Sequence, residues 1–127
     1  MAQDEEPSGA QKAFGDFATA FVGFTDDVLF GQVWTRPQLS PKERSLITVA
    51  ALTTSGNTDQ LVYHLCLAKE NGATEAELTE AITHLAFYAG WPKAMSAMTV
   101  AKQVFTCDPH RLTERHQRRR HGKGRPP

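Results

Sequence analysis

A succession of helix start and stop signals, from residue 40 onward, is the feature of this sequence that most constrains its fold. In the clearest of them, Ser40 can act as an N-cap, Pro41 occupies the first helical position, and Glu43 completes a capping box. Gly56 then supplies a stop signal. These signals predict a helix over residues 41–55.

Three further helices follow from the same kind of signal. They are expected over residues 58–71, 75–89 and 92–105. Thr74 and Glu77 form a second capping box at the start of the middle one. Each predicted helix boundary is marked by a capping or stop residue, and no segment has a convincing strand pattern. The sequence therefore predicts an all-α fold.

The N-terminal part also has a helical pattern. Four phenylalanines recur at steps of three and four residues: Phe14, Phe17, Phe21 and Phe24. We expect one first helix whose aromatic stripe packs in the core. Thr25 is expected to cap a short second helix that Pro37 ends. The predicted architecture is a compact, single-domain bundle of about six helices over residues 9–108.

The two ends differ from this domain in composition. Residues 1–8 and 109–127 are polar and charged, so we expect both to be disordered. The C-terminal segment has seven Lys/Arg against one acid, whereas the whole chain has a formal net charge of zero. Arginine runs can bind nucleic acid through phosphates. This one lacks interleaved aromatic residues, so we expect a solvated end that contacts the acidic body of another subunit.

Composition excludes several classes of protein. The chain has 127 residues, of which 40% are hydrophobic, enough for one domain with a single core. No apolar run approaches the roughly 18–20 residues of a membrane span. The acidic, polar start does not resemble a secretory signal. We therefore expect a cytoplasmic protein without a membrane partner.

His64 lies in the helix expected over residues 58–71. At about 100° per residue, the apolar stripe of this helix consists of three residues: Leu61, Leu65 and Ala68. His64 falls about 60° from Leu61, at the edge of this stripe, and Gln60 and Asn71 share its flank. This histidine is either an ordinary hydrogen-bonded residue or part of a polar site.

Cys66 stands two positions from His64 in the sequence but about 160° away on the helix. The two residues therefore cannot form a catalytic pair or a chelate. We expect Cys66 to be a small apolar residue or an interface residue. With Cys107 as the other cysteine, the chain shows no disulfide framework and no zinc site, and no metal is expected.

His84 and Tyr88 are neighbours at positions i and i+4 on a flank of the helix expected over residues 75–89. Two helices that each carry a histidine beside an apolar stripe indicate a shared polar pocket. Arg44 lies in the first turn of its helix, where the positive end of the helix dipole does not stabilise a positively charged side chain. It is either a carboxylate binder or an ordinary ion-pair partner. Trp91 can line the pocket or pack in the core.

Two segments carry a resemblance to a known family. They are "LFGQVWTRPQLSPKERSLITVAAL" and "HLCLAKENGATEAELTEAITHLAFYAGWPKAMSAM". Over roughly Phe14 to Phe105, the chain resembles the carboxymuconolactone decarboxylase family. The resemblance implies a compact all-helical subunit that forms homo-oligomers, as trimers or hexamers.

One branch of that family is alkylhydroperoxidase-like and uses a C-x-x-C pair followed by a histidine. When this chain is aligned on His64, the two cysteines of that pattern fall on Asn57 and Gln60. Neither residue is a thiol, and a dithiol peroxidase needs both a thiolate attacker and a resolving thiol. The other branch, γ-carboxymuconolactone decarboxylase, therefore fits the sequence better.

The resemblance implies a small carboxylated substrate and a decarboxylation that needs no metal, pyridoxal phosphate or thiamine. We expect His64 to act as general acid, with His84 as the second candidate, and Arg44 to bind a substrate carboxylate. Three further residues are expected to line the site: Gln60, Tyr88 and Trp91. Two alternatives remain, a family member that binds without turnover and a thiol-dependent antioxidant that uses Cys66 and Cys107.

Overall fold

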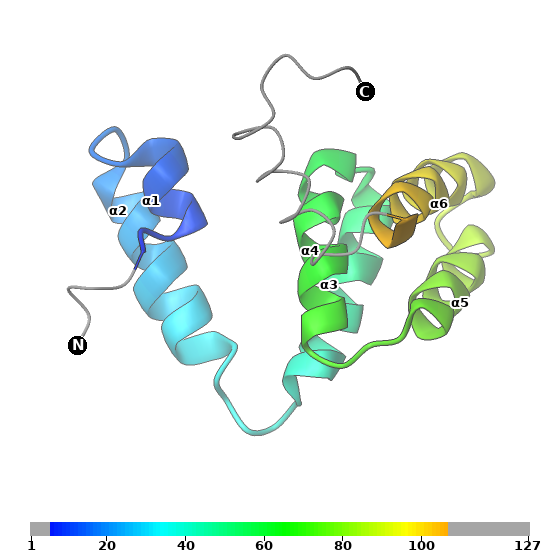
Figure 1. Cartoon of the computed structure of the whole chain (residues 1–127), viewed down its shortest axis with the longest axis horizontal. Helices are drawn as coiled ribbons and strands as arrows, with labels where there is room; N and C mark the ends of the chain where they lie inside the picture. Colours follow the sequence, from blue (N-terminus) through cyan, green and yellow to red (C-terminus); the bar gives the residue numbers. More distant parts are fainter. Residues whose placement is uncertain (1–5, 107–127) are drawn as a thin grey trace, which may run out of the picture. The chain divides into compact units, whose positions relative to one another are not determined.

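A computed structural model describes residues 6–106, and this part of the chain is entirely helical (Figure 1). The all-α prediction is confirmed for these residues, which contain no strand. The elements are six α-helices and one π-helix: α1 (Gly9–Phe14), α2 (Thr19–Gly23), η2 (Phe24–Val33), α3 (Pro41–Ser55), α4 (Thr58–Glu70), α5 (Glu75–Ala86) and α6 (Trp91–Thr106).

The chain divides into an N-terminal unit, residues 1–41, and a C-terminal unit, residues 42–127. The predicted basic tail, residues 109–127, and Cys107 lie outside the described residues. In the N-terminal unit, the Ser8 hydroxyl accepts the Gln11 N–H, and the Gln11 side chain accepts the Ser8 N–H in return. Ser8 also donates to the Asp26 carboxylate at 2.9 Å, which links the start of α1 to η2.

The expectation of one aromatic helix packed in the core is wrong. Gly15, with φ 41°, ends α1 directly after Phe14, so the stripe does not form one continuous helical face. The four phenylalanine side chains are 41–91% exposed, and Val22 is the one hydrophobic side chain buried among residues 6–40. So short a unit has too few apolar partners to cover four rings.

Thr25 does not cap a separate helix, which corrects a second expectation. It lies inside η2, which continues α2 without a break, and its hydroxyl donates to the Phe21 carbonyl at 2.8 Å. Gly31 fits the wide π-helical turn because a Cβ there would lie 3.0 Å from the Asp26 carbonyl oxygen.

The C-terminal unit contains the hydrophobic core. Three of its four helices start where the sequence predicts, and α6 begins one residue early, at Trp91. α3 spans the predicted residues, and α4 ends one residue early. The Thr74 capping box is confirmed, with bonds of 3.0 Å and 2.9 Å between Thr74 and Glu77. α5 ends at Ala86 rather than at residue 89, and residues 87–90 form the turn to α6.

The core joins all four helices of this unit. Side chains of α4 and α5 are fully buried at its centre: Leu61, Leu65, Ala68, Leu78 and Ile82. α6 contributes small residues that allow close helix packing, among them Ala97 and Ala101. Burying one Leu or Ile side chain stabilises a fold by about 1.5–3 kcal/mol. No helix between residues 6 and 106 is both long and apolar enough to cross a membrane.

Candidate functional site

His64 sits half-buried at the edge of the apolar stripe of α4, as predicted. Its neighbours Leu61 and Leu65 are fully buried. The His64 ring contacts the Tyr63 ring edge-on, with the ring centroids 5.0 Å apart. Burial lowers the pKa of His64 below its ordinary value because it disfavours the charged imidazolium. Burial therefore favours the neutral imidazole over the imidazolium in the protein alone.

The flank of α4 that carries His64 faces α3. Asn71, two turns beyond His64 on the same face, donates its side-chain N–H to the Ser45 hydroxyl at 3.0 Å. Ser45 is completely buried, so this bond connects the end of α4 to the start of α3 inside the fold. Removing one partner of such a bond leaves a buried polar group unpaired, at a cost of about 1–3 kcal/mol.

Arg44 immediately precedes Ser45 and is half-buried, with its Nε atom buried. α3 and α4 are joined by two residues and run antiparallel. At 1.5 Å per residue, His64 lies about 10 Å along the axis of α4 from the level of Ser45 and Arg44. Gln60 is exposed one turn beyond His64, further from Arg44.

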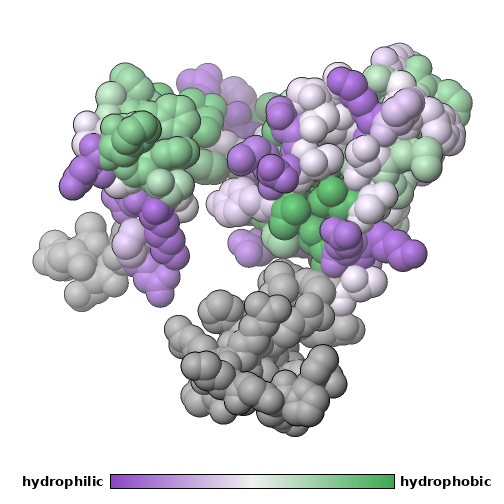
Figure 2. Space-filling view, turned by 90° about the horizontal axis from the view of Figure 1, so that it is seen from above, coloured by the Kyte–Doolittle hydropathy of each residue, from purple (hydrophilic) through white to green (hydrophobic). Residues whose placement is uncertain are grey.

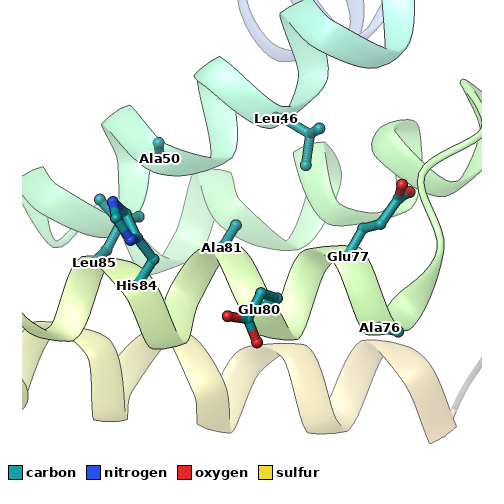
Figure 3. A pocket seen from close by; sticks show the side chains of 8 residues that line it. All are labelled: Leu46, Ala50, Ala76, Glu77, Glu80, Ala81, His84 and Leu85. Atoms are coloured by element: carbon teal, nitrogen blue, oxygen red, sulfur yellow. The ribbon is translucent and has the colours of Figure 1, made fainter.

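His84 lines a groove of ≈ 580 Å³ between α3 and α5 (Figure 3). The groove is mostly apolar, with Leu46 and Ala50 from α3 opposite side chains of α5. The rings of His84 and Tyr88 are 4.8 Å apart, which confirms that they are neighbours. His64 does not line this groove, so the groove is not a pocket shared by the two histidines.

Two glutamates, Glu77 and Glu80, are among the residues that line the groove. Lys42 binds Glu77 at 2.8 Å, and this hydrogen bond, with those from Thr74, holds the pKa of Glu77 below its usual value. Glu80 adds an exposed carboxyl group beside His84. The lining of the groove is thus mostly apolar, with one ion pair and one further carboxylate.

The six expected site residues fall into two groups. Arg44, Gln60 and His64 belong to the α3–α4 pair. Of the others, His84 lies in α5, Tyr88 in the turn that follows it, and Trp91 at the start of α6. Neither the α3 residues that line the groove opposite α5 nor the burial of Ser45 was predicted from the sequence. The i, i+4 spacing of Leu46 with Ala50, and of Glu80 with His84, shows which residues share a helix face, but not that the two faces lie opposite each other.

Cys66 is half-buried against the core on the far side of α4 from His64. Burial raises the pKa of its thiol, and the charge of Glu70 raises it further, while Lys69 partly opposes the effect. A raised pKa keeps the thiol protonated, the reverse of what a reactive cysteine needs. Among residues 6–106, no three His, Cys, Asp or Glu side chains gather as metal ligands.

The sequence profile of the carboxymuconolactone decarboxylase family matches residues 17–103. A 4-carboxymuconolactone decarboxylase from Acinetobacter baylyi is 42% identical over 90 residues, which cover 71% of this chain and 67% of that protein. A nitrosuccinic acid decarboxylase from Metarhizium robertsii is 39% identical over 75 residues, 59% of this chain and 52% of that protein. An uncharacterized 15.0 kDa protein from Paracoccus denitrificans is 31% identical over 81 residues, 62% of this chain and 60% of that protein. The chain thus spans between half and two thirds of these relatives.

Proposed function

Since this chain belongs to the carboxymuconolactone decarboxylase family, we propose that it is a cofactor-independent decarboxylase of the γ-carboxymuconolactone type. Its substrate would be that lactone or a similar small carboxylated compound. The observation that carries the proposal is that two relatives, 42% and 39% identical, are decarboxylases with different substrates.

The two substrates share a chemical property that defines the class. Loss of CO2 leaves a carbanion, and an oxygen-bearing group of the substrate takes up its charge. In the lactone this group is the conjugated carbonyl, and in nitrosuccinic acid it is the nitro group on the carbon that bears a carboxyl group. The substrate thus provides its own electron sink. The protein must hold a carboxylate, stabilise the developing oxyanion and deliver a proton to carbon.

Arg44 would hold the substrate carboxylate, and His64 would deliver the proton to carbon. A guanidinium binds a carboxylate through two parallel hydrogen bonds, and a long arginine side chain can span part of the offset of about 10 Å. His64 would give a proton to the carbanion carbon as the carboxylate leaves as CO2. Because burial lowers the pKa of free His64, a bound anionic substrate would be needed to favour the imidazolium.

Gln60 would donate its amide N–H to the oxyanion from one turn beyond His64. His84 remains the second candidate for proton delivery, with Tyr88 and Trp91 lining that side. Glu80 lies one turn before His84 on α5, and its carboxylate would repel an anionic substrate, which makes His84 the weaker candidate.

The direct test is CO2 release from γ-carboxymuconolactone by the purified protein. We expect turnover to persist in the presence of a strong chelator, because the chemistry requires no metal. Nitrosuccinic acid serves as the second substrate, and succinic acid, which lacks the electron sink, serves as the negative control. If neither activated acid releases CO2 above the uncatalysed rate, the proposal is wrong.

The substitution Cys66→Ser distinguishes the proposed decarboxylation from a thiol-dependent activity. We expect the substitution to leave kcat/KM for decarboxylation unchanged, since Cys66 faces away from His64 and its thiol is held protonated. Peroxide consumption by the wild-type protein is the parallel measurement. Loss of decarboxylation in Cys66→Ser, with the fold intact by circular dichroism, would contradict the assignment.

A further inference from the structure

The groove between α3 and α5 is open because small and apolar side chains form most of its walls. Three of its lining residues are alanines and two are leucines: Ala50, Ala76, Ala81, Leu46 and Leu85. Its volume of ≈ 580 Å³ lies within the range of about 300–1,000 Å³ that is usual for small-molecule sites. The space-filling view shows apolar residues at the surface of the C-terminal unit, next to hydrophilic ones (Figure 2). The groove therefore offers an apolar surface to the body of a small ligand.

One charge in the lining of the groove is not balanced. The Glu77 carboxylate already has a cation, because Lys42 lies 2.8 Å from it. Glu80 is exposed at the rim of the groove, and no Lys or Arg among residues 6–106 forms an ion pair with it. Glu80 thus leaves the lining with one uncompensated negative charge.

Two rings follow Glu80 along α5. His84 lies one helical turn after Glu80 on the same face, and its ring points toward α3 (Figure 3). The Tyr88 ring lies 4.8 Å from the His84 ring and is accessible, since Tyr88 is 78% exposed. A neutral imidazole accepts a hydrogen bond, and the face of a tyrosine ring attracts cations. A carboxylate followed by these two rings favours a positively charged group that donates hydrogen bonds.

We propose that the α3–α5 groove binds a free amphipathic amine, with its ammonium group between Glu80 and His84 and its apolar body along Leu46 and Ala50. Charge selects this class of ligand. Glu80 would repel a carboxylate, and a neutral apolar molecule would leave the charge of Glu80 without a partner. The site is separate from the decarboxylation proposed at Arg44 and His64 and does not depend on it.

NMR titration of the full chain with three six-carbon compounds tests the class of ligand. Hexylammonium, hexanol and hexanoate share one apolar chain and differ in charge. At about pH 8 an aliphatic amine is protonated. We expect hexylammonium to bind about two- to fivefold more tightly than hexanol, the usual gain from an exposed ion pair, and hexanoate to bind most weakly. Octylammonium should bind more tightly again, by about two- to fourfold for each added methylene that is buried.

Two variants locate the ligand in the groove. Glu80→Gln should remove the preference for hexylammonium over hexanol. Ala50→Phe should weaken binding of both by about tenfold or more, because its ring occupies the space in which the hexyl chain is buried. Glu75→Gln is the matched control for charge, since Glu75 lies on the same helix but is bound to Lys69 at 2.6 Å outside the groove lining. Ile47→Phe is the control for size, since Ile47 is 56% exposed on α3 and does not line the groove.

The proposal is wrong if the wild type does not bind hexylammonium, or binds hexanol or hexanoate equally well. Wild-type affinity in a folded Ala50→Phe would place the ligand outside the groove and would also overturn it. If Ala50→Phe does not fold, Glu80→Gln decides the question, because an exposed carboxylate can be replaced without loss of the core. The titration requires no turnover, so a wild type that releases no CO2 would defeat the proposed function without affecting this site.

Discussion

Replacing His64 by glutamine is expected to lower kcat/KM for decarboxylation by about 10²–10⁴-fold, the usual contribution of a general acid. Glutamine has a similar size and can still form hydrogen bonds, but it cannot deliver a proton near neutral pH. The half-buried position of His64 should tolerate it, so the melting temperature should stay near that of the wild type. Steady-state kinetics with γ-carboxymuconolactone give the measurement.

The pH profile separates a proton donor from a structural residue. If protonated His64 is required, kcat/KM of the wild type falls as pH rises through the pKa of free His64. Burial places this pKa below the ordinary value, so the fall is expected on the acidic side of pH 6.5. His64→Gln should lack this limb. His84→Gln is the matched control and should retain it. The reverse result, a loss confined to His84→Gln, would move the proton donor to the α3–α5 groove.

Leu65→Ala is expected to destabilise the protein by about 2–5 kcal/mol. Leu65 is completely buried beside His64, and its truncation leaves a cavity among close-packed helices. Since whole domains are stable by about 5–15 kcal/mol, this change removes a large share of the total. Urea unfolding followed by circular dichroism measures it, at one protein concentration for all variants.

Val62→Ala is the control for this stability experiment. Val62 lies on the same helix and is 45% exposed, so its truncation should change stability by less than about 0.5 kcal/mol. Both changes leave the α-helical propensity of α4 unchanged or improved. Equal losses in the two variants would mean that the apolar stripe of α4 is not what holds this helix in the fold.

The helices of the C-terminal unit could be predicted because their boundaries depend on local chemistry. The Thr74 capping box needs only residues within one helical turn, and its two hydrogen bonds are present. The end of α5 was placed three residues late because residues 87–89 continue the apolar pattern. In the structure Phe87 and Tyr88 face outward in a turn, and the pattern there reflects a surface rather than a core.

The prediction that the aromatic stripe of the first helix packs in the core failed for a related reason. Periodicity assigns a face only if the helix is continuous, and Gly15 interrupts it after Phe14. Sequence spacing alone cannot show whether other parts of the chain supply enough apolar surface to cover a stripe. Within the N-terminal unit, the four rings of the stripe remain 41–91% exposed.

The candidate site was predictable where it depends on one helix and not where it depends on two. Rotation around α4 correctly placed His64 at the edge of the stripe and separated it from Cys66. The groove beside His84 required α3 and α5 to lie opposite each other, with Leu46 and Ala50 more than thirty residues from His84 in the sequence. No local pattern contains that information.

The short turns between α3, α4, α5 and α6 have a consequence for the order of events in the cell. Four consecutive helices with connections of two to four residues build the core from contacts that are mostly close in sequence. Chains of this kind reach their folded state in about microseconds to milliseconds. Encounter between two subunits depends on concentration and takes about milliseconds to minutes. The four-helix core of each newly synthesised chain is therefore expected to form before any such encounter takes place.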